Sequence, residues 1–331
     1  MMCKVQHLLE SMFKLKVLGD LKYFLGLELA RLPEGIVLSQ RKYTLSILED
    51  TNFVDAKPSS LPMETNLRMS AFDGDPLHDP STYRRIIRRL MYLTISRPDI
   101  TYAVSTLSQF LSKPTTTHLT ALHHLLRYLK GSVGQGLLFS AKSELQLMAY
   151  ANADWAGCPD TRRSVTGYCV FIGDSLISWR SKKKQHTVSR SSAESEYRAM
   201  AAVAAELTWL KGLLSDFQVD IPSSMLFCDS QSAIHIATNP TFHERTKHIE
   251  IDCHFVRERV MAGFLNLLHV RTQYQLADVF TKPVTLAQFN NLISKKGSEL
   301  DDGGKKKMNK KASTGGRLKT KDGLATTHTR I

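Results

Sequence analysis

The chain has 331 residues, of which 42% are hydrophobic and 23% charged, so it is long enough for two hydrophobic cores and not biased as a disordered chain would be. Its formal net charge of +13 favours a polyanionic partner. No apolar run approaches the roughly 18 to 20 residues that a membrane helix requires, and five scattered cysteines without paired spacing are typical of reduced thiols, so we expect a soluble intracellular protein of the cytoplasm or nucleus, not a secreted one.

The first part of the chain predicts a small, mostly helical α+β unit. Residues 13–50 predict a strand, a Pro-Glu-Gly turn, a second strand and a helix from Thr44. Several prolines mark residues 56–80 as a linker-like stretch. Apolar residues at helical spacing then predict helices from Tyr83, over 100–111 and over 118–129.

Four arginines lie off the apolar stripe of the helix that begins near Tyr83. They are Arg84, Arg85, Arg88 and Arg89. Such a group forms either a solvated helix face or a track for nucleic acid, and the sequence leaves both interpretations open. Arg97-Pro98-Asp99 and Lys113-Pro114 separate this helix from the next two, because proline ends one helix and can begin another.

Three alternating apolar runs predict a three-stranded meander after residue 137. The first leads through Leu147 and Ala149 to Asn152 and Asp154, and the second and third span 168–172 and 175–179. Tight connections at 157–160 and 173–174 separate the runs. The three tryptophans, at positions 155, 179 and 209, are expected to be core aromatics rather than platforms on which bases stack.

A helix, a strand and further short elements follow the meander. Ser191 and Glu194 form a Ser-x-x-Glu capping box that opens a helix through about residue 214, with Glu196 in its first turn. Residues 225–228 predict a strand that ends in Asp229, and a second helix begins directly afterwards. Residues 265–270 predict the last strand, and Asp278 opens a final helical turn.

The order strand-strand-strand-helix-strand-helix, with acidic residues near the first strand, the first helix, the end of the fourth strand and a late helix, resembles the ribonuclease H fold. That fold is an α/β arrangement with a mixed five-stranded sheet and flanking helices. Five segments in order resemble the C-terminal part of copia-type LTR retrotransposon Pol polyproteins: Tyr-Ala-Asn-Ala-Asp-Trp-Ala-Gly, Arg-Ser-Ser-Ala-Glu-Ser-Glu-Tyr-Arg-Ala, Cys-Asp-Ser-Gln-Ser-Ala-Ile, Arg-Thr-Lys-His-Ile and Ala-Asp-Val-Phe-Thr-Lys-Pro.

The resemblance runs from about residue 13 to about residue 296 and implies three parts. Residues 1–136 would be a C-terminal fragment of a reverse transcriptase, comprising the end of the palm and the thumb or connection region. Residues 137–296 would be a ribonuclease H domain, and residues 297–331 a disordered basic tail. We also expect the chain to be cut from a longer reading frame and to lack polymerase activity, since no Tyr-x-Asp-Asp hairpin occurs in it.

The resemblance implies two-metal hydrolysis of the RNA strand of RNA·DNA hybrids, with Mg²⁺ or Mn²⁺ held by converging carboxylates. The implied catalytic positions are Asn152, Glu196, Asp229 and Asp278, and the last three would be the metal ligands. Glu194 competes with Glu196 for the helix position. We favour Glu196, because Glu194 fits the capping box.

Position 152 departs from the family pattern, which reads Asp-Ala-Asp-Trp-Ala-Gly where this chain has Asn152 first. An amide offers one neutral oxygen where two cations require an anion between them, so we expect impaired cleavage. Asp154 lies two residues further along the strand, displaced by roughly 6 to 7 Å on the same face, and does not easily substitute.

Two basic groups are candidates for contacting a nucleic-acid backbone. They are Arg180, Lys182, Lys183, Lys184 and Arg190 in one group and Arg245 and Lys247 in the other. A solvated loop explains the first group and helix packing the second equally well.

Three interpretations of the whole chain follow: a ribonuclease H that works on hybrids beside the rest of a retrotransposon polyprotein, a catalytically dead remnant that at most binds nucleic acid, and an interaction module without a nucleic-acid role.

Overall fold

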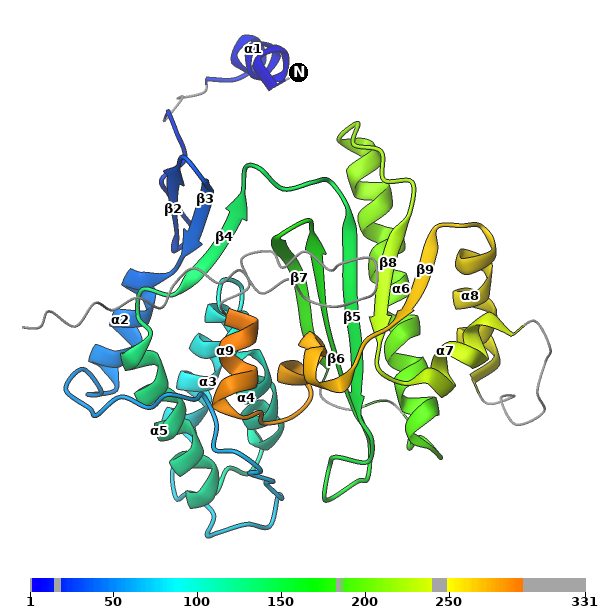
Figure 1. Cartoon of the computed structure of the whole chain (residues 1–331). Coiled ribbons are helices and arrows are strands. Elements are labelled where there is room, and N and C mark those ends of the chain that lie inside the picture. Colours follow the sequence, from blue (N-terminus) through cyan, green and yellow to red (C-terminus); the bar gives the residue numbers. More distant parts are fainter. Residues whose placement is uncertain (1, 15–18, 183–184, 186, 240–248, 294–331) are drawn as a thin grey trace, which may run out of the picture. The chain divides into compact units, whose positions relative to one another are not determined.

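The computed structural model describes residues 2–14, 19–182, 185, 187–239 and 249–293 (Figure 1). Residues 1–296 form one compact unit and residues 297–331 a second. The predicted basic tail therefore lies outside the described residues. The division of residues 1–296 into a reverse-transcriptase part and a nuclease part stays a prediction.

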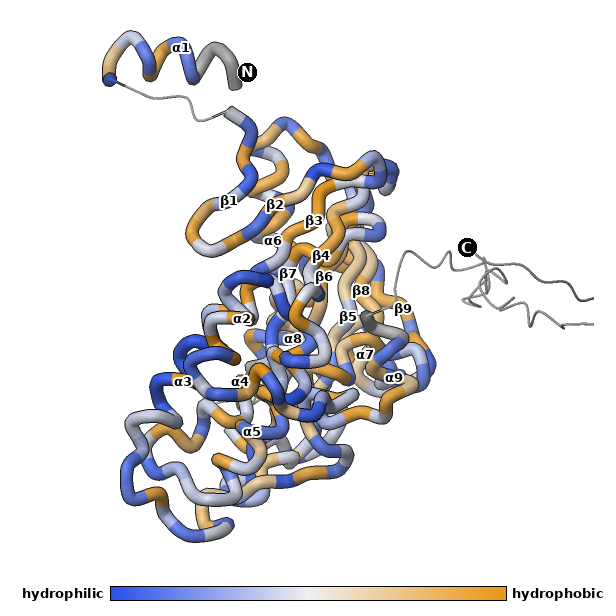
Figure 2. Tube along the Cα trace, turned by 90° about the vertical axis from the view of Figure 1, so that its left-hand side faces the viewer, coloured by the Kyte–Doolittle hydropathy of each residue, from blue (hydrophilic) through white to orange (hydrophobic). Residues whose placement is uncertain are grey.

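A small antiparallel sheet is built from the N-terminal residues and one later strand. Helix α1 spans Met2–Met12, and the strands are β1 (Tyr23–Phe24), β2 (Leu27–Leu32), β3 (Gly35–Ser39) and β4 (Gly136–Ser140), paired in that order. The hydrophobic residues of β3 and β4 lie side by side (orange in Figure 2). The strand at the predicted domain boundary thus pairs with the first part of the chain.

Four helices and two 3₁₀ turns follow β3 and enclose their own apolar core. The elements are α2 (Arg41–Asp50), α3 (Ser81–Leu93), η1 (Pro98–Ile100), α4 (Thr101–Leu107), η2 (Ser108–Phe110) and α5 (Thr116–Gly131). Their buried faces carry the leucines and isoleucines whose spacing predicted them, such as Ile87, Leu90 and Leu126. The predicted helices of this part are confirmed.

Most of the arginines of α3 form hydrogen bonds or ion pairs within the helical part of the chain. Arg84 donates hydrogen bonds to the carbonyl oxygens of Leu111 and Ser112 at 2.7 and 2.9 Å. Arg85 and Arg89 both pair with the Asp50 carboxylate. Of the four, these three have partners within the fold, which favours the interpretation of this surface as a helix face over that of a nucleic-acid track.

A mixed five-stranded sheet forms the centre of the second part of the chain. Its strands are β5 (Leu147–Asp154), β6 (Val165–Ile172), β7 (Ser175–Lys182), β8 (Ser224–Cys228) and β9 (Leu265–His269). They lie in the order β7-β6-β5-β8-β9, with β5, β6 and β7 antiparallel and with β8 parallel to both β5 and β9. This is the α/β sheet expected of a ribonuclease H-like fold, and the fold prediction is confirmed.

Each face of the five-stranded sheet has its own cover. Helices α6 (Ser192–Asp216), α7 (Gln231–Thr238) and α8 (Glu250–Met261) cover one face and pack on small side chains such as Ala149 and Ala151 (Figure 1). The 3₁₀ turn η5 (Leu276–Phe280) packs on the other face against Tyr150 and Phe171. The remaining elements are η4 (Thr272–Tyr274) and α9 (Leu286–Ile293). Alternate residues of β5 therefore point to opposite faces.

The prediction that all three tryptophans lie in the core is wrong for two of them. Trp155 is 48% exposed and Trp209 is 60% exposed, whereas Trp179 packs against the apolar cluster on the η5 side of the sheet. Trp209 lies outside the buried stripe of α6, which its neighbours Leu207 and Leu210 provide.

None of the helices in the described part of the chain is long and apolar enough to cross a membrane.

Candidate active site

Asn152 lies near the end of β5 on the face that η5 covers. Its amide nitrogen donates to Asp278 Oδ1 at 2.6 Å and to Thr281 Oγ1 at 2.8 Å, and its side chain is buried. The neighbouring strand position is Gly167, where a β-carbon would come within 2.6 Å of Thr281 Cγ2 and 2.8 Å of Phe280 Cβ. The absent side chain thus lets η5 approach the sheet and bring Asp278 to position 152.

Gln275 fixes η5 to the strand and was not singled out from the sequence. Its Nε2 donates to the carbonyl oxygen of Ala151 at 2.9 Å, while its Oε1 accepts from the backbone N–H of Ala277 at 3.1 Å. The side chain is buried, so both bonds are shielded from water. A glutamine two residues before the Ala-Asp pair was the available signal, since an amide side chain can cap a turn.

Glu196 reaches the same end of β5 from α6. Its Oε1 accepts from the backbone N–H of Ala153 at 3.0 Å, and Cys228 Sγ lies 3.9 Å from its Oε2. Burial raises the pKa of Glu196 to about 8, an effect that the Ala153 hydrogen bond opposes and the Asp229 carboxylate reinforces. At neutral pH this carboxyl therefore holds a proton for much of the time.

Glu194 has different surroundings from Glu196. The Ser191 hydroxyl accepts from the Glu194 backbone N–H at 3.2 Å, which is the first half of the predicted capping box. The Glu194 carboxylate accepts from the backbone N–H of Arg190, one residue before the cap, at 2.7 Å, so the second half of the box is shifted by one residue. The same carboxylate pairs with Arg198 at 3.0 Å. Of the two competing glutamates, it is Glu196 that lies beside Cys228 and Asp229.

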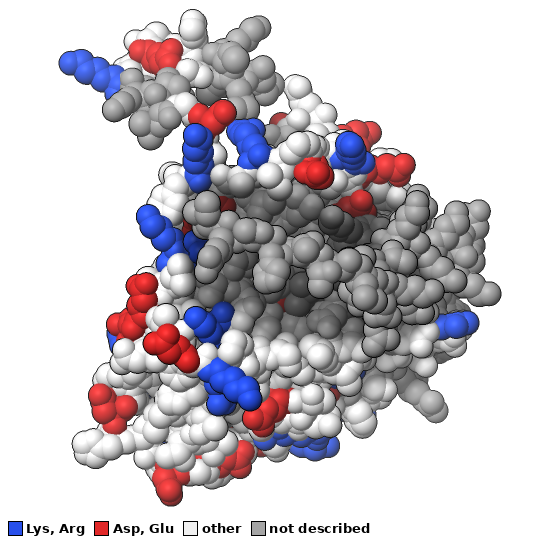
Figure 3. Space-filling model, turned by 60° about the vertical axis from the view of Figure 1, so that its left-hand side comes forward, with Lys and Arg blue, Asp and Glu red and all other residues white. Residues whose placement is uncertain are grey.

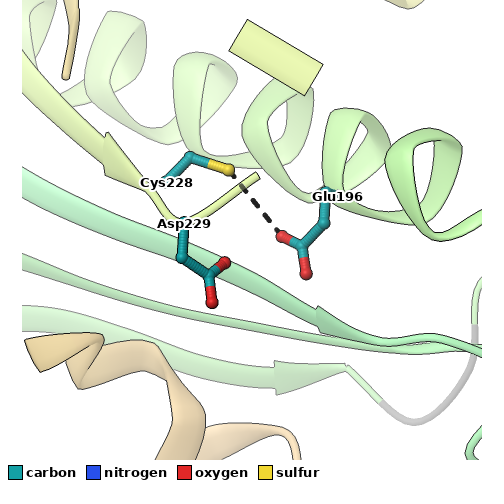
Figure 4. Close-up of side chains that lie close together, drawn as sticks. All are labelled: Glu196, Cys228 and Asp229. Atoms are coloured by element: carbon teal, nitrogen blue, oxygen red, sulfur yellow. Dashed lines mark hydrogen bonds between the residues drawn. The ribbon is translucent and has the colours of Figure 1, made fainter. Parts of the chain in front are cut away.

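Asp229 follows the last residue of β8 and joins Glu196 at the end of the parallel strands. One oxygen of its carboxylate accepts from the Thr272 hydroxyl at 3.1 Å. Single ligand atoms of Glu196, Cys228 and Asp229 lie within 4.8 Å of one another, and Figure 4 shows Glu196 pointing from its helix toward the end of the strand. Within the described part of the chain, these three side chains lie close enough together to hold one metal ion.

Asp278 is almost completely buried, with 2% of its surface exposed. Its Oδ1 accepts from the Asn152 amide and lies 3.1 Å from Lys282 Nζ, whereas its Oδ2 has no hydrogen-bond partner among the described residues. Burial raises the pKa of this carboxyl, and Lys282 opposes that rise. A buried carboxylate oxygen without a partner is costly, which indicates that the site is built to take a further ligand.

Asp154 lies beside this group and faces a cavity of about 370 Å³. The cavity is lined by Lys282 and Asp154 on one side and by Arg68 and Tyr102 from the helical part on the other. Burial raises the pKa of Asp154, while Lys282 and Arg68 lower it. Asp160 ties the two parts together at this point, because its carboxylate accepts from the Ser70 hydroxyl at 2.6 Å.

The predicted phosphate-contacting residues are described only in part. Arg180 on β7 and Arg190 before α6 are both exposed. Lys182 belongs to β7, but its side chain, like Lys183, Lys184, Arg245 and Lys247, lies outside the described residues. On the face drawn in Figure 3, basic and acidic side chains are interspersed. A role of these residues in binding nucleic acid stays a prediction.

The side chains present fit a divalent cation. Glu196, Asp229 and Asp278 offer hard carboxylate oxygens, which Mg²⁺ and Mn²⁺ prefer, and Asp278 Oδ2 is a buried acceptor still without a donor. Asn152 does not add to this charge. Its amide nitrogen, the atom turned toward Asp278, is a donor and cannot ligate a cation.

The chain is similar in sequence to a reverse transcriptase family model and to curated Pol polyproteins. Residues 1–65 match the family model described as reverse transcriptase (RNA-dependent DNA polymerase). The retrovirus-related Pol polyprotein from transposon RE1 of Arabidopsis thaliana is 44% identical over 87% of this chain and 20% of its own length. The Pol polyprotein from transposon TNT 1-94 of Nicotiana tabacum is 35% identical over 87% of this chain and 22% of its own length.

The chain belongs to the copia-type retrotransposon Pol polyproteins. It spans about a fifth of the length of the curated Pol relatives named above. Among solved structures, LC11-RNase H1 in complex with an RNA/DNA hybrid is 14% identical, with a TM-score of 0.31 over 41% of this chain and 94% of the other. For this Pol chain the fold assignment therefore rests on the strand order and register of its own sheet.

Proposed function

We propose that this Pol chain carries a ribonuclease H site that hydrolyses the RNA strand of RNA·DNA hybrids, and that Asn152 impairs it. One observation carries the proposal. Ligand atoms of Glu196 and Asp229, which are far apart in sequence, lie within 4.8 Å of each other at the end of β8, and Asp278, bonded to Asn152 on β5, adds a negative charge that raises the pKa of Glu196. The family sequence has an aspartate at that position, so the native chain has one fewer anion at the site.

A divalent cation would be held by Glu196, Asp229 and Asp278, and when bound it would supply the positive charge that acidifies a water and stabilises the leaving oxygen. The chain's own residues prepare that site. Gln275 and Gly167 hold Asp278 against the strand, and the Ala153 backbone N–H orients Glu196. Because these supports are backbone bonds and close packing, the carboxyl groups are positioned before any substrate arrives.

Asn152 changes the chemistry in two ways. The amide has no charge to share with a second cation, and its N–H group occupies Asp278 Oδ1. A second candidate function follows from that hydrogen bond. If the amide prevents a cation from binding to Asp278, the Pol chain is a remnant that binds a nucleic acid without cutting it. The exposed Arg180 and Arg190 would then be among the contacts.

Cleavage of a labelled RNA·DNA hybrid by the full chain distinguishes these functions. The variants are the native chain, Asn152→Asp, and Asn152→Asp combined with Asp229→Asn, each in Mg²⁺ and in Mn²⁺. We expect Asn152→Asp to cut at least about 100-fold faster than the native chain, since the restored anion acts on the transition state. The double variant should return to the background rate.

Two other results would change the assignment. Equal cutting by the native chain and Asn152→Asp, abolished by Asp229→Asn, would mean that position 152 is not the bridging position. Failure of all three folded variants to cut would leave the nucleic-acid-binding remnant, and salt-dependent binding of the uncut hybrid then separates that function from a module without nucleic-acid affinity.

A further inference from the structure

Lys282 contributes a positive charge to the acidic cluster, which we define as Asp154, Glu196, Asp229 and Asp278. Its Nζ lies 3.1 Å from Asp278 Oδ1, and its side chain is 40% exposed whereas that of Asp278 is 3% exposed. Within the described part of the chain, no other lysine or arginine makes an ion pair with a member of the cluster. The ammonium therefore reaches from the surface into a buried group of carboxyls.

The two oxygens of Asp278 are used unequally. Oδ1 has two donors, the Asn152 amide at 2.6 Å and the Lys282 ammonium at 3.1 Å. Oδ2 is buried and has no partner among the described residues. The free oxygen Oδ2 can ligate a cation. The other oxygen, Oδ1, already contacts a positive charge, which opposes the binding of that cation.

Lys282 also acts on the rest of the cluster. It lowers the pKa of Asp154, Glu196 and Asp278, whereas burial raises the pKa of all three. Arg68 adds a second positive charge that faces Asp154 across the cavity, and Asp229 adds a negative charge that faces Glu196 and Asp278. The carboxyls thus have a resident neutralising charge in the absence of a metal ion.

We propose that Lys282 is the resident counter-ion of the acidic cluster and that it competes with a divalent cation for Asp278. The proposal rests on the proposed function in that it takes the cluster as the cation site. An ammonium on one oxygen of a carboxylate repels a cation on the other, and inside a protein this repulsion is weakly screened. Asn152 and Lys282 then lower the affinity for the cation together, one by lacking a negative charge and the other by adding a positive one.

The test measures Mn²⁺ binding to the full chain by electron paramagnetic resonance, without substrate. Lys282→Met keeps most of the length of the side chain and removes the charge. The matched control is Lys211→Met, which removes the same charge from near the C-terminal end of α6, where Lys211 Nζ lies 4.5 Å from the centre of the Phe264 ring. Lys282→Arg keeps the charge at the cluster.

We expect Lys282→Met to bind Mn²⁺ roughly tenfold more tightly than the native chain, which corresponds to about 1.4 kcal/mol. Lys211→Met and Lys282→Arg should stay within about threefold of the native value. In metal-free buffer Lys282→Met should also melt at a lower temperature, because Asp278 is left buried without its counter-ion, and Mn²⁺ should raise its melting temperature more than that of the native chain.

Asp229→Asn separates failure of this proposal from failure of the proposed function. If Asp229→Asn weakens Mn²⁺ binding but Lys282→Met binds no more tightly than the native chain, the cluster is the cation site and the counter-ion proposal is wrong. If no variant binds Mn²⁺, or Asp229→Asn leaves binding unchanged, both the cation site and the counter-ion role are wrong. Equal tightening by Lys282→Met and Lys211→Met would reduce the effect to net charge and would also overturn the proposal.

Discussion

Two buried charged groups in this molecule are satisfied to different degrees. In the helical part, Arg97 and Asp99 are 1% and 4% exposed, and the guanidinium donates to both Asp99 oxygens and to the Ser132 carbonyl oxygen. The Tyr128 hydroxyl also donates to Asp99, at 2.6 Å. At the candidate active site, Asp278 Oδ2 has no partner among the described residues, and burial raises the pKa of Glu196 to about 8.

This difference in hydrogen bonding indicates different roles for the Arg97–Asp99 pair and for the carboxyls of the candidate site. A buried ion pair whose hydrogen bonds are all made holds its neighbours in one arrangement, because any shift would leave a charge unpaired. A buried carboxyl with a free oxygen and a raised pKa weakens the fold until something binds, and such groups are typical of functional sites. The helical part thus contributes stability, whereas the end of the β5 and β8 strands holds the carboxyls that the proposed cation would bind.

The largest effect should come from breaking the saturated pair. Arg97→Met leaves Asp99 buried without its partner, and we expect the free energy of unfolding to fall by about 3–5 kcal/mol. Urea unfolding of the full chain measures this. Arg85→Met, which removes an exposed partner of Asp50, should cost less than about 1 kcal/mol. A loss below 1 kcal/mol at Arg97 would contradict the contrast between the two groups.

A smaller effect should follow from adding a charge to the unsaturated group. Asn152→Asp replaces the N–H donor to Asp278 by a second carboxyl, and without a divalent cation we expect the free energy of unfolding to fall by about 1–3 kcal/mol. Mn²⁺ at a hundredfold excess over its dissociation constant should add about 2.7 kcal/mol. Asn266→Asp, at an exposed position of β9, is the matched control and should show neither change.

A third effect, spread over several pH units, is a pH dependence of stability in chelator-treated protein. Burial raises the pKa of Glu196 from 4.5 to about 8, so between these values the folded chain holds a proton that the unfolded chain has lost. The contribution of this carboxyl is complete below pH 4.5 and is lost as the pH rises to 8. The free energy of unfolding should therefore decline with pH by up to about 1.4 kcal/mol per unit.

Glu196→Gln cannot titrate and should lack this decline, whereas Glu258→Gln, whose side chain is 71% exposed, should keep it. Denaturant unfolding at a series of pH values from 4.5 to 8.5 measures both. A native slope that Glu196→Gln leaves unchanged would show that another group titrates in this range.

Much of the fold could be predicted from particular residues. The Ser191 side chain caps α6 where the sequence predicted the start of a helix. Strand β8 ends directly before Asp229, also as predicted. These features are local, because a cap or a strand end is decided by a few neighbouring side chains. The exposure of Trp155 and Trp209 could not be predicted in this way, since burial depends on which segments pack against them.

The pairings across the sequence were out of reach for the same reason. Nothing near Gly136 indicates that β4 pairs with β3, almost a hundred residues earlier in the chain. From the sequence, Arg97 and Asp99 were interpreted only as part of a helix boundary at a proline. The hydrogen bond between Tyr128 and Asp99 depends on how α5 packs. The contact of Lys282 with Asp278, in contrast, spans only four residues, and the local turn at η5 sets it.

The sequence by itself determined the family and the order of strands and helices, because motifs and periodicity are properties of neighbouring residues, whereas the four site positions stay predictions. Only the tertiary structure decided how those positions meet. The approach of η5 over Gly167 brings the Asn152 amide into contact with the Asp278 carboxylate. Such contacts depend on distances between segments more than a hundred residues apart, and close packing of the sheet sets those distances.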